Sequence, residues 1–181
     1  MALNPTAPTG RERYLGADDI IVSKTDLKGH ITYANRTFLE IAGYTEDEVL
    51  GVAHNLVRHP EMPRCVFAIL WEIIQGGREV FAYVKNMAKS GDHYWVFAHV
   101  TPSFGSDGGI VGYHSNRRAP DQASVEAVAR LYARLNRAEA TAGRPKEQIA
   151  RGKAELEAAL AEAGMDYERF CFTVWGGRTA A

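Results

Sequence analysis

The polar block Arg58-His59-Pro60-Glu61 contains side chains that are well suited to bind a ligand. The Arg58 guanidinium offers a planar fork of N–H donors that matches a phosphate, although an ion pair with Glu61 is the plainer alternative. His59 could hydrogen-bond a cofactor, ligate an iron, or fix the loop before Pro60. Further along, Asn86 carries an amide that both donates and accepts hydrogen bonds. These residue types favour a binding site.

Two tryptophans could add aromatic surface to such a site. Trp71 falls in the apolar segment 63–76, where its indole could stack on a ring system or pack in the core. Trp95 alternates with its neighbours along a strand-like run, so its side chain lies on one face of a sheet. Whether that face meets a ligand does not follow from the sequence.

No constellation of residues in the sequence indicates catalysis or metal binding. The serines lack the elbow motif that exposes a nucleophile. His93, His99 and His114 lie at least six positions apart on strand-like runs, without the spacing of a zinc site. The Gly-Gly pairs lack the strand-to-helix context of a dinucleotide-binding loop. We therefore expect that the protein is not an enzyme.

The composition is that of a soluble globular protein. The chain has 181 residues, of which 46% are hydrophobic and 24% charged, enough for one domain and an appendage. With 21 basic and 22 acidic side chains, nothing indicates binding to nucleic acid or to an anionic membrane. The longest uncharged apolar stretch, 65–71, is too short for membrane insertion. Cys65 and Cys171 lie in apolar runs and predict reduced thiols in a cytoplasmic protein.

Hydrophobic periodicity and turn residues predict the elements that position these side chains. Strands are expected over 19–25 and 30–34, and again over 79–87, 93–104 and 109–116, joined by hairpin turns. Between the two groups of strands, Asn35 caps a short helix and a buried helix is expected over 63–76. This order predicts an α+β fold in which short helices pack on one face of an antiparallel sheet.

The chain is expected to have three parts. Residues 1–18, rich in Pro and Gly, form an N-terminal cap that we expect to be mobile, and 19–120 form the sheet domain. Residues 121–181 form a helical extension, with helices over 121–137 and 145–163 and an apolar run at 170–175. The first of these helices carries a narrow apolar seam that could pair with a second copy or with another protein: Val125, Val128, Tyr132 and Leu135.

Several motifs resemble a known family. The stretches Thr25-Asp26-Leu27 and Ile31-Thr32-Tyr33-Ala34-Asn35 resemble the start of a PAS domain. Two further blocks closely resemble the sensory PAS domain of bacterial aerotaxis receptors: Arg58-His59-Pro60-Glu61-Met62-Pro63 and Lys89-Ser90-Gly91-Asp92-His93-Tyr94-Trp95. The resemblance runs from about residue 19 to 120. It implies the PAS fold, a five-stranded antiparallel sheet.

The resemblance implies a function as well as a fold. The aerotaxis receptor domains hold FAD noncovalently and report redox state, and here Arg58 would hold its pyrophosphate and Asn86 the polar edge of its ring system. The residues implied to contact the cofactor are Asn35, His54, Arg58, His59, Trp71, Asn86 and Trp95. Photoreceptor domains of the same superfamily need a cysteine in an Asn-Cys-Arg-Phe block. Here that region reads Asn55-Leu56-Val57-Arg58-His59, so light-driven adduct formation is not expected.

Aerotaxis receptors continue into a membrane anchor and a signalling helical bundle, which residues 121–181 do not match. We therefore expect the signal to pass to a separate protein, a chemoreceptor or a kinase, with a homodimer through the PAS domain and helix 121–137 as a further expectation. Two other functions stay open. One is a haem-based gas sensor with His59 as axial ligand, and the other is a cofactor-free interaction module.

Overall fold

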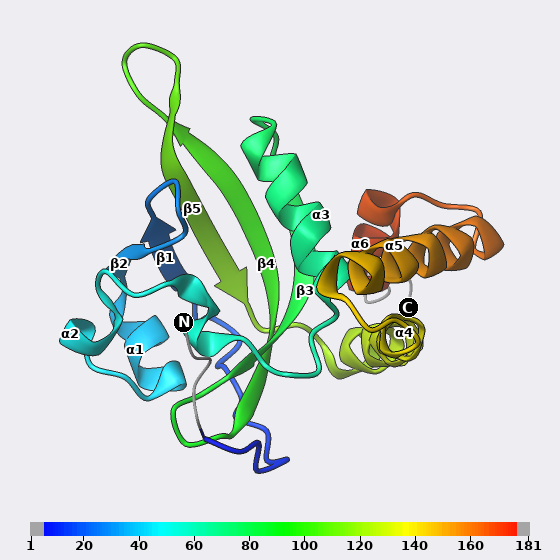
Figure 1. Ribbon diagram of the computed structural model, residues 1–181. Helices are drawn as coiled ribbons and strands as arrows, with labels where there is room; N and C mark the ends of the chain where they lie inside the picture. The colour runs from blue at the N-terminus through cyan, green and yellow to red at the C-terminus, as the bar shows by residue number, and fades with distance from the viewer. Residues whose placement is uncertain (1–5, 177–181) are drawn as a thin grey trace. The chain divides into compact units, whose positions relative to one another are not determined.

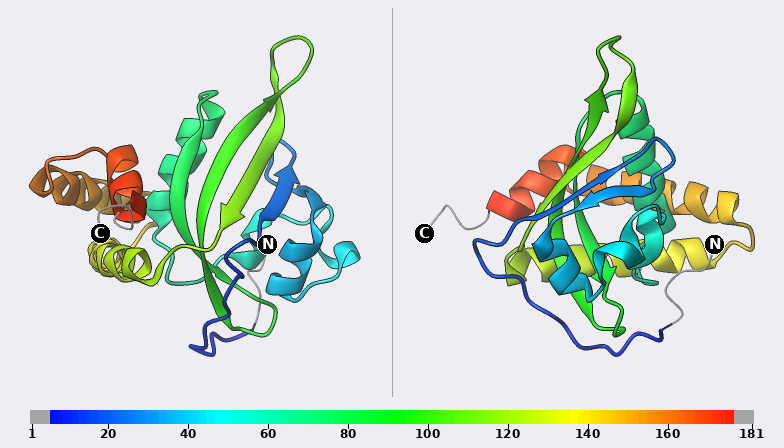
Figure 2. Two further views of the ribbon diagram at one scale, coloured as in Figure 1. Left: turned by 180° about the vertical axis from the view of Figure 1, so that it is seen from behind. Right: turned by 90° about the vertical axis from the view of Figure 1, so that its left-hand side faces the viewer.

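The structure, a computed structural model, describes residues 6–176. Five strands form one antiparallel sheet in the order β2-β1-β5-β4-β3, so the last strand of the chain lies beside the first (Figure 1). The strands are β1 (Ile21–Thr25), β2 (Ile31–Ala34), β3 (Val80–Met87), β4 (His93–Phe104) and β5 (Ile110–Arg118). β4 and β5 run on past the other strands as a long hairpin (Figure 2). The predicted α+β fold is confirmed.

Short helices connect the two groups of strands, and local signals fix where they begin. Helix α1 (Arg36–Ala42) begins where the Asn35 side chain accepts a hydrogen bond from the Phe38 N–H. It ends at Gly43, whose φ of 72° suits glycine. Helix α2 (Glu46–Val49) begins with a capping box, and a 3-10 turn, η1 (His54–Val57), follows. Figure 1 shows α1 and α2 beside β1 and β2.

The chain divides into two compact units. Among the described residues, the sheet unit comprises those up to Pro60 together with Ile73–Ala119, and the helical unit comprises Glu61–Glu72 together with those from Pro120 onward. Helix α3 (Arg64–Gln75) therefore begins in the helical unit and ends in the sheet unit. Within residues 6–176, no helix has both the length and the apolar character that crossing a bilayer requires.

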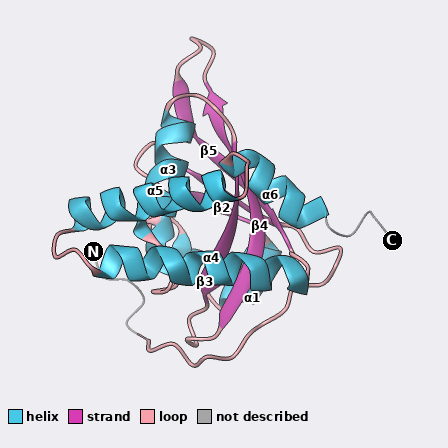
Figure 3. Cartoon of the chain, turned by 90° about the vertical axis from the view of Figure 1, so that its right-hand side faces the viewer, coloured by secondary structure: helices cyan, strands magenta, loops and turns pink. Residues whose placement is uncertain are grey.

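The helical unit also contains α4 (Gln122–Ala140), α5 (Pro145–Glu162) and α6 (Tyr167–Gly176). Helices α4 and α5 run side by side (Figure 3). The apolar seam predicted on α4 is covered within the chain, since Val128 and Leu135 are fully buried and Tyr132 nearly so. This seam is therefore packed inside the chain and is not exposed for pairing with a second copy.

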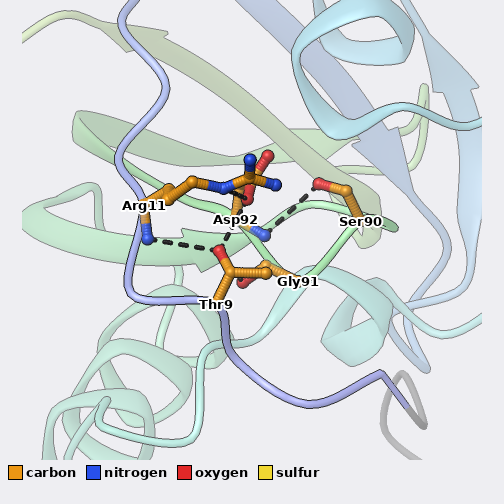
Figure 4. A network of polar contacts seen from close by, with 5 residues as sticks. All are labelled: Thr9, Arg11, Ser90, Gly91 and Asp92. Carbon is orange, nitrogen blue, oxygen red and sulfur yellow. Dashed lines mark hydrogen bonds and ion pairs between the residues drawn. The ribbon is translucent and has the colours of Figure 1, made fainter.

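The N-terminal segment pairs with the β3–β4 hairpin from Thr9 onward. The Thr9 N–H donates to the Gly91 carbonyl, the His93 N–H to the Arg11 carbonyl, and the Arg13 N–H to the His93 carbonyl. Asp92 accepts hydrogen bonds from the Thr9 hydroxyl at 2.6 Å and from the Arg11 guanidinium at 3.1 Å (Figure 4). Residues 9–13, which the sequence predicted to be mobile, are instead held by backbone hydrogen bonds to Gly91 and His93. These partners lie some 80 residues further along the chain, as do the side-chain partners, so no local signal revealed them.

Cross-strand register decides which side chains share a face of the sheet, because directly opposed residues point the same way and alternate residues point oppositely. One face, here called the Arg117 face, carries Ser23 opposite Ser115, Arg117 opposite Ala98, and Tyr94 opposite Asn86. The other, the Trp95 face, carries three mainly aromatic cross-strand pairs: Phe81 with His99, Tyr83 with Phe97, and Lys85 with Trp95.

Candidate functional site

Arg117, on the central strand β5, is a buried cation without a carboxylate partner among the residues that the structure describes. Its Nη2 atom lies 2.8 Å from the Ser23 hydroxyl and 2.7 Å from Nε2 of His54, and its side chain is 5% exposed. The ring of Phe38, from α1, lies 5.8 Å from the guanidinium carbon. Within residues 6–176, no Asp or Glu forms an ion pair with Arg117.

The charge states of this cluster follow from its contacts. A guanidinium only donates hydrogen bonds, so Nε2 of His54 accepts and the ring proton of the neutral imidazole is on Nδ1. Burial, together with the Arg117 charge, lowers the pKa of His54 to about 3. Burial also lowers the pKa of Arg117 to about 10, which leaves it protonated at neutral pH. The Arg117 face therefore holds a positive charge that no described carboxylate balances, an arrangement suited to an electron-rich or anionic group.

Two buried hydroxyl groups lie on the same face. Tyr94 is 1% exposed, and neither its hydroxyl nor that of Ser115 finds a hydrogen-bond partner among the described residues. Burial raises the pKa of Tyr94, while the charge of Arg117 opposes the rise, so the phenol lies within the field of the guanidinium. Buried polar groups are almost always hydrogen-bonded. These two hydroxyls can therefore serve a ligand.

Two of the predicted site residues come together next to Tyr94. Asn86 is buried and lies directly opposite Tyr94 across the β3–β4 ladder. Arg58 forms an isolated antiparallel bridge with Asn86, so the loop after η1 runs along the edge of β3 at this point. The sheet unit thus assembles Arg58 and Asn86 with Tyr94, and His54 with Arg117.

The other predicted residues are placed differently. His59 is buried, and its ring meets that of His93 edge to face with centroids 5.8 Å apart. The Asn35 amide is occupied by the backbone, because it accepts from the Val22 N–H as well as capping α1, and donates to the Ile20 carbonyl. Asn35 therefore holds β1 against α1.

The register separates Trp95 from Asn86. Trp95 pairs with Lys85 on the Trp95 face, opposite to the face that carries Asn86, and the Lys85 ammonium lies 6.0 Å from its ring centroid. Trp71 lies on α3 in the part of that helix that belongs to the helical unit, where it is partly buried. The Trp95 indole therefore does not share a face of the sheet with Asn86.

Sequence reasoning missed the central cluster of Ser23, Tyr94, Ser115 and Arg117. The predicted strand ended at residue 116, one position before Arg117. A signal was present, since Tyr113, Ser115 and Arg117 alternate along β5 and all are buried. A charged residue at the inward position of a central strand indicates either a structural partner or a ligand.

Comparison with known proteins is consistent with this architecture. Residues 31–117 match the protein family described as the PAS fold. The chain is 42% identical over 138 residues to the aerotaxis receptor of Escherichia coli (strain K12), covering 76% of this chain and 26% of the receptor. It is 34% identical over 87 residues to a blue-light-activated histidine kinase of Rhizobium johnstonii, covering 48% of this chain and 25% of the kinase. The chain thus spans about a quarter of the length of these relatives.

Solved structures show the same fold. The light-state structure of the blue-light photoreceptor Aureochrome1 LOV is similar with a TM-score of 0.53 and 27% identity, covering 62% of this chain and 88% of that one. The PAS domain of a protein from Colwellia psychrerythraea is similar in fold, with a TM-score of 0.51 and 19% identity over 55% of this chain and 85% of that one. Residues 31–117 therefore form a domain of the PAS fold family, and the chain is similar in sequence to an aerotaxis receptor.

Proposed function

We propose that this protein is a redox or oxygen sensor whose PAS domain holds FAD noncovalently on the Arg117 face and signals to a partner protein. The observation that carries the proposal is the buried Arg117 guanidinium, which has no carboxylate partner within residues 6–176. The sequence identity of 42% to an aerotaxis receptor supports the same function, and a relative described as a blue-light-activated histidine kinase supports a chromophore.

The donor set of this face fits a flavin. The isoalloxazine ring has a polar edge of carbonyl oxygens and ring nitrogens, which needs both donors and acceptors, and flat faces that need apolar contact. Asn86 would supply donor and acceptor to that edge, while Arg117 and the Tyr94 hydroxyl would donate to its oxygens. Arg58, bridged to Asn86, would bind the phosphates. Phe38, which lies against the guanidinium of Arg117, would add apolar surface.

The same side chains would pass on a change of charge. A bound flavin supplies redox chemistry by taking up electrons and protons. Arg117 holds hydrogen bonds to Ser23 on β1 and to His54 on η1, so a shift in its position would reach three elements of the sheet unit at once. Such a local electrostatic change can bias a two-state element. We propose a chemoreceptor or a kinase as the receiver.

The absorption spectrum of the purified protein tests the proposal. Bands of oxidised flavin are expected, and mass spectrometry of the cofactor released by heat should identify FAD. Because a noncovalent cofactor can be lost during purification, the colourless protein is also titrated with FAD. A Soret band would favour the haem sensor, and failure to bind added FAD would favour the cofactor-free interaction module. Either result would overturn the proposal.

A further inference from the structure

Glu139, on α4, places its buried carboxylate at the N-terminus of α3. Its Oε2 accepts from the Arg64 N–H at 2.9 Å and its Oε1 from the Cys65 N–H at 2.8 Å, and the side chain is 5% exposed. The first N–H groups of a helix have no partner within it, and a negative charge is favoured there. Glu139 therefore caps α3 from a position 75 residues further along the chain.

The first turn of α3 has no acidic residue of its own. The residue before Arg64 is Pro63, which offers no N–H, and the preceding Met62 is apolar and buried. A cap usually comes from a neighbouring Ser, Thr, Asp or Asn. Here the donors of Arg64 and Cys65 depend on a side chain from α4.

Helix α5 closes over the same point. A Cβ atom at Gly152 would lie 2.6 Å from Oε1 of Glu139 and 2.8 Å from the sulfur of Cys65, so the backbone of α5 leaves no room for a methyl group. Two further contacts join α4 and α5 to residues 61–72. The Asn136 amide donates to the Glu61 carbonyl at 2.6 Å, and the Lys153 ammonium pairs with Glu72 at 2.6 Å.

We propose that Glu139 is a latch that couples the first turn of α3 to the packing of α4 and α5, so that all three open and close as one cooperative step. The carboxylate makes charge-assisted hydrogen bonds that exist only when the helices are together. Helix α3 is continuous and ends in the sheet unit. A displacement of its C-terminal residues would therefore also move its first turn and disturb the hydrogen bonds to Glu139. This device goes beyond the proposed function and does not depend on any cofactor.

The latch is mechanical and not a thiol switch. Cys65 is fully buried, and its pKa is raised to about 12 by burial and by the neighbouring Glu139. Since the thiolate is the reactive form of cysteine, the Cys65 thiol is inert at neutral pH. Movement of a helix, and not oxidation, is therefore what would open the contact.

Hydrogen exchange of the full chain, followed by mass spectrometry, tests the latch. The Glu139→Gln variant keeps the size of the side chain but loses its charge and presents an NH₂ group to one of the two backbone donors. Exchange at Arg64 and Cys65, and over α4 and α5, is expected to accelerate together by about tenfold or more, with the sheet strands β1 and β5 unchanged. The matched control is Glu126→Gln, an exposed glutamate on α4. Faster exchange confined to the start of α3, or an equal effect in the control, would refute the coupling.

A second variant perturbs α5 and leaves Glu139 in place. It keeps the proposal testable if Glu139→Gln does not fold. Gly152→Ala leaves Glu139 unchanged and by helix propensity alone should stabilise α5. If the helices are coupled, the methyl group added at position 152 must push α5 away from α3 and α4. Hydrogen exchange at Arg64 and Cys65 should then accelerate, although residue 152 makes no hydrogen bond to either of them. Gly143→Ala, where a Cβ meets nothing within 4 Å, is the control. Unchanged protection of Arg64 and Cys65 in Gly152→Ala would overturn the proposal.

Discussion

Nη2 of Arg117 lies 2.7 Å from Nε2 of His54, so a buried guanidinium is paired with a neutral imidazole where a carboxylate is the usual partner. A carboxylate would neutralise the guanidinium, and the cluster would then need no ligand to balance its charge. An imidazole satisfies one N–H donor and leaves the charge in place. The arrangement therefore keeps the Arg117 face positive in the absence of a ligand, at a cost in folding free energy.

Replacing Arg117 by Met is expected to weaken FAD binding by tenfold or more without a matching loss of stability. The variant removes donors from the proposed site, worth ~1.5–3 kcal/mol for hydrogen bonds to a charged group. It also removes an unpaired buried charge, so the free energy of unfolding of the cofactor-free protein should fall by less than about 1 kcal/mol. Flavin fluorescence titration and urea unfolding measure the two quantities.

Arg118→Met is the matched control for this prediction, because Arg118 is exposed and the alternation of β5 turns it to the other face. It should bind FAD as the unsubstituted protein does. Equal binding by both variants would exclude Arg117 from the site.

The His54 imidazole predicts a loss of stability in weak acid. Its pKa is about 3 in the folded state against 6.5 when unfolded, chiefly because of burial. Below pH 6.5 the unfolded chain takes up a proton that the folded chain refuses, so stability is complete above pH 6.5 and falls as the pH drops toward 3. At pH 5 the loss from this group is ~2 kcal/mol.

Urea unfolding at pH 8 and pH 5 measures this loss, and His54→Gln should reduce the difference between the two pH values by that amount, since glutamine can still accept from Arg117. His114→Gln, on β5, controls for the removal of a histidine. An unchanged difference in His54→Gln would contradict the assigned neutral imidazole.

Gly91 is expected to tolerate no side chain, because the N-terminal segment crosses directly over it. Its φ is +88°, and a Cβ would lie 2.3 Å from the carbonyl oxygen of Ala7. Gly91→Ala should therefore detach the segment from the β3–β4 hairpin, exposing the N–H groups of Thr9 and Arg13 to hydrogen exchange. The expected loss of stability is ~1–3 kcal/mol.

Gly108, at the tip of the β4–β5 hairpin, separates the two causes of that loss. It has a φ of +78°, but a Cβ there meets nothing within 4 Å. Gly108→Ala therefore measures backbone strain alone. If both variants lose the same stability and the Thr9 amide stays protected, the close approach of Ala7 does not contribute.

The elements of the fold were predictable because their signals are local. Asn35 begins α1 and Gly43 ends it, and each acts within four residues of its own position. Alternation and turn residues likewise predicted all five strands to within a few residues. The contacts that the sequence did not predict join residues that are far apart in the chain. His54 and Arg117 are 63 residues apart, and they meet only because β5 inserts beside β1.

The candidate site was predicted in part for the same reason. Asn86 and Trp95 were grouped as contacts of one cofactor, but the β3–β4 register puts Asn86 opposite Tyr94 and so turns Trp95 to the other face. Register depends on the length of the turn between the strands, and a shift of one residue reverses every side chain. Glu139, which caps α3 from α4, gave no signal in the sequence around α3.

The flavin-loaded protein is expected to form no cysteine adduct under blue light, although a blue-light-activated histidine kinase is among its relatives. Its two cysteines are Cys65 and Cys171, and burial raises the pKa of each thiol to about 12. Position 56 in the loop block that precedes Arg58 is leucine. Illumination should therefore cause no bleaching that recovers in the dark through loss of a carbon–sulfur bond. Absorption spectra before and after illumination give the result, with Cys65→Ala and Cys171→Ala as paired variants. Reversible bleaching that disappears in one of these two variants would show that its thiol reaches the flavin.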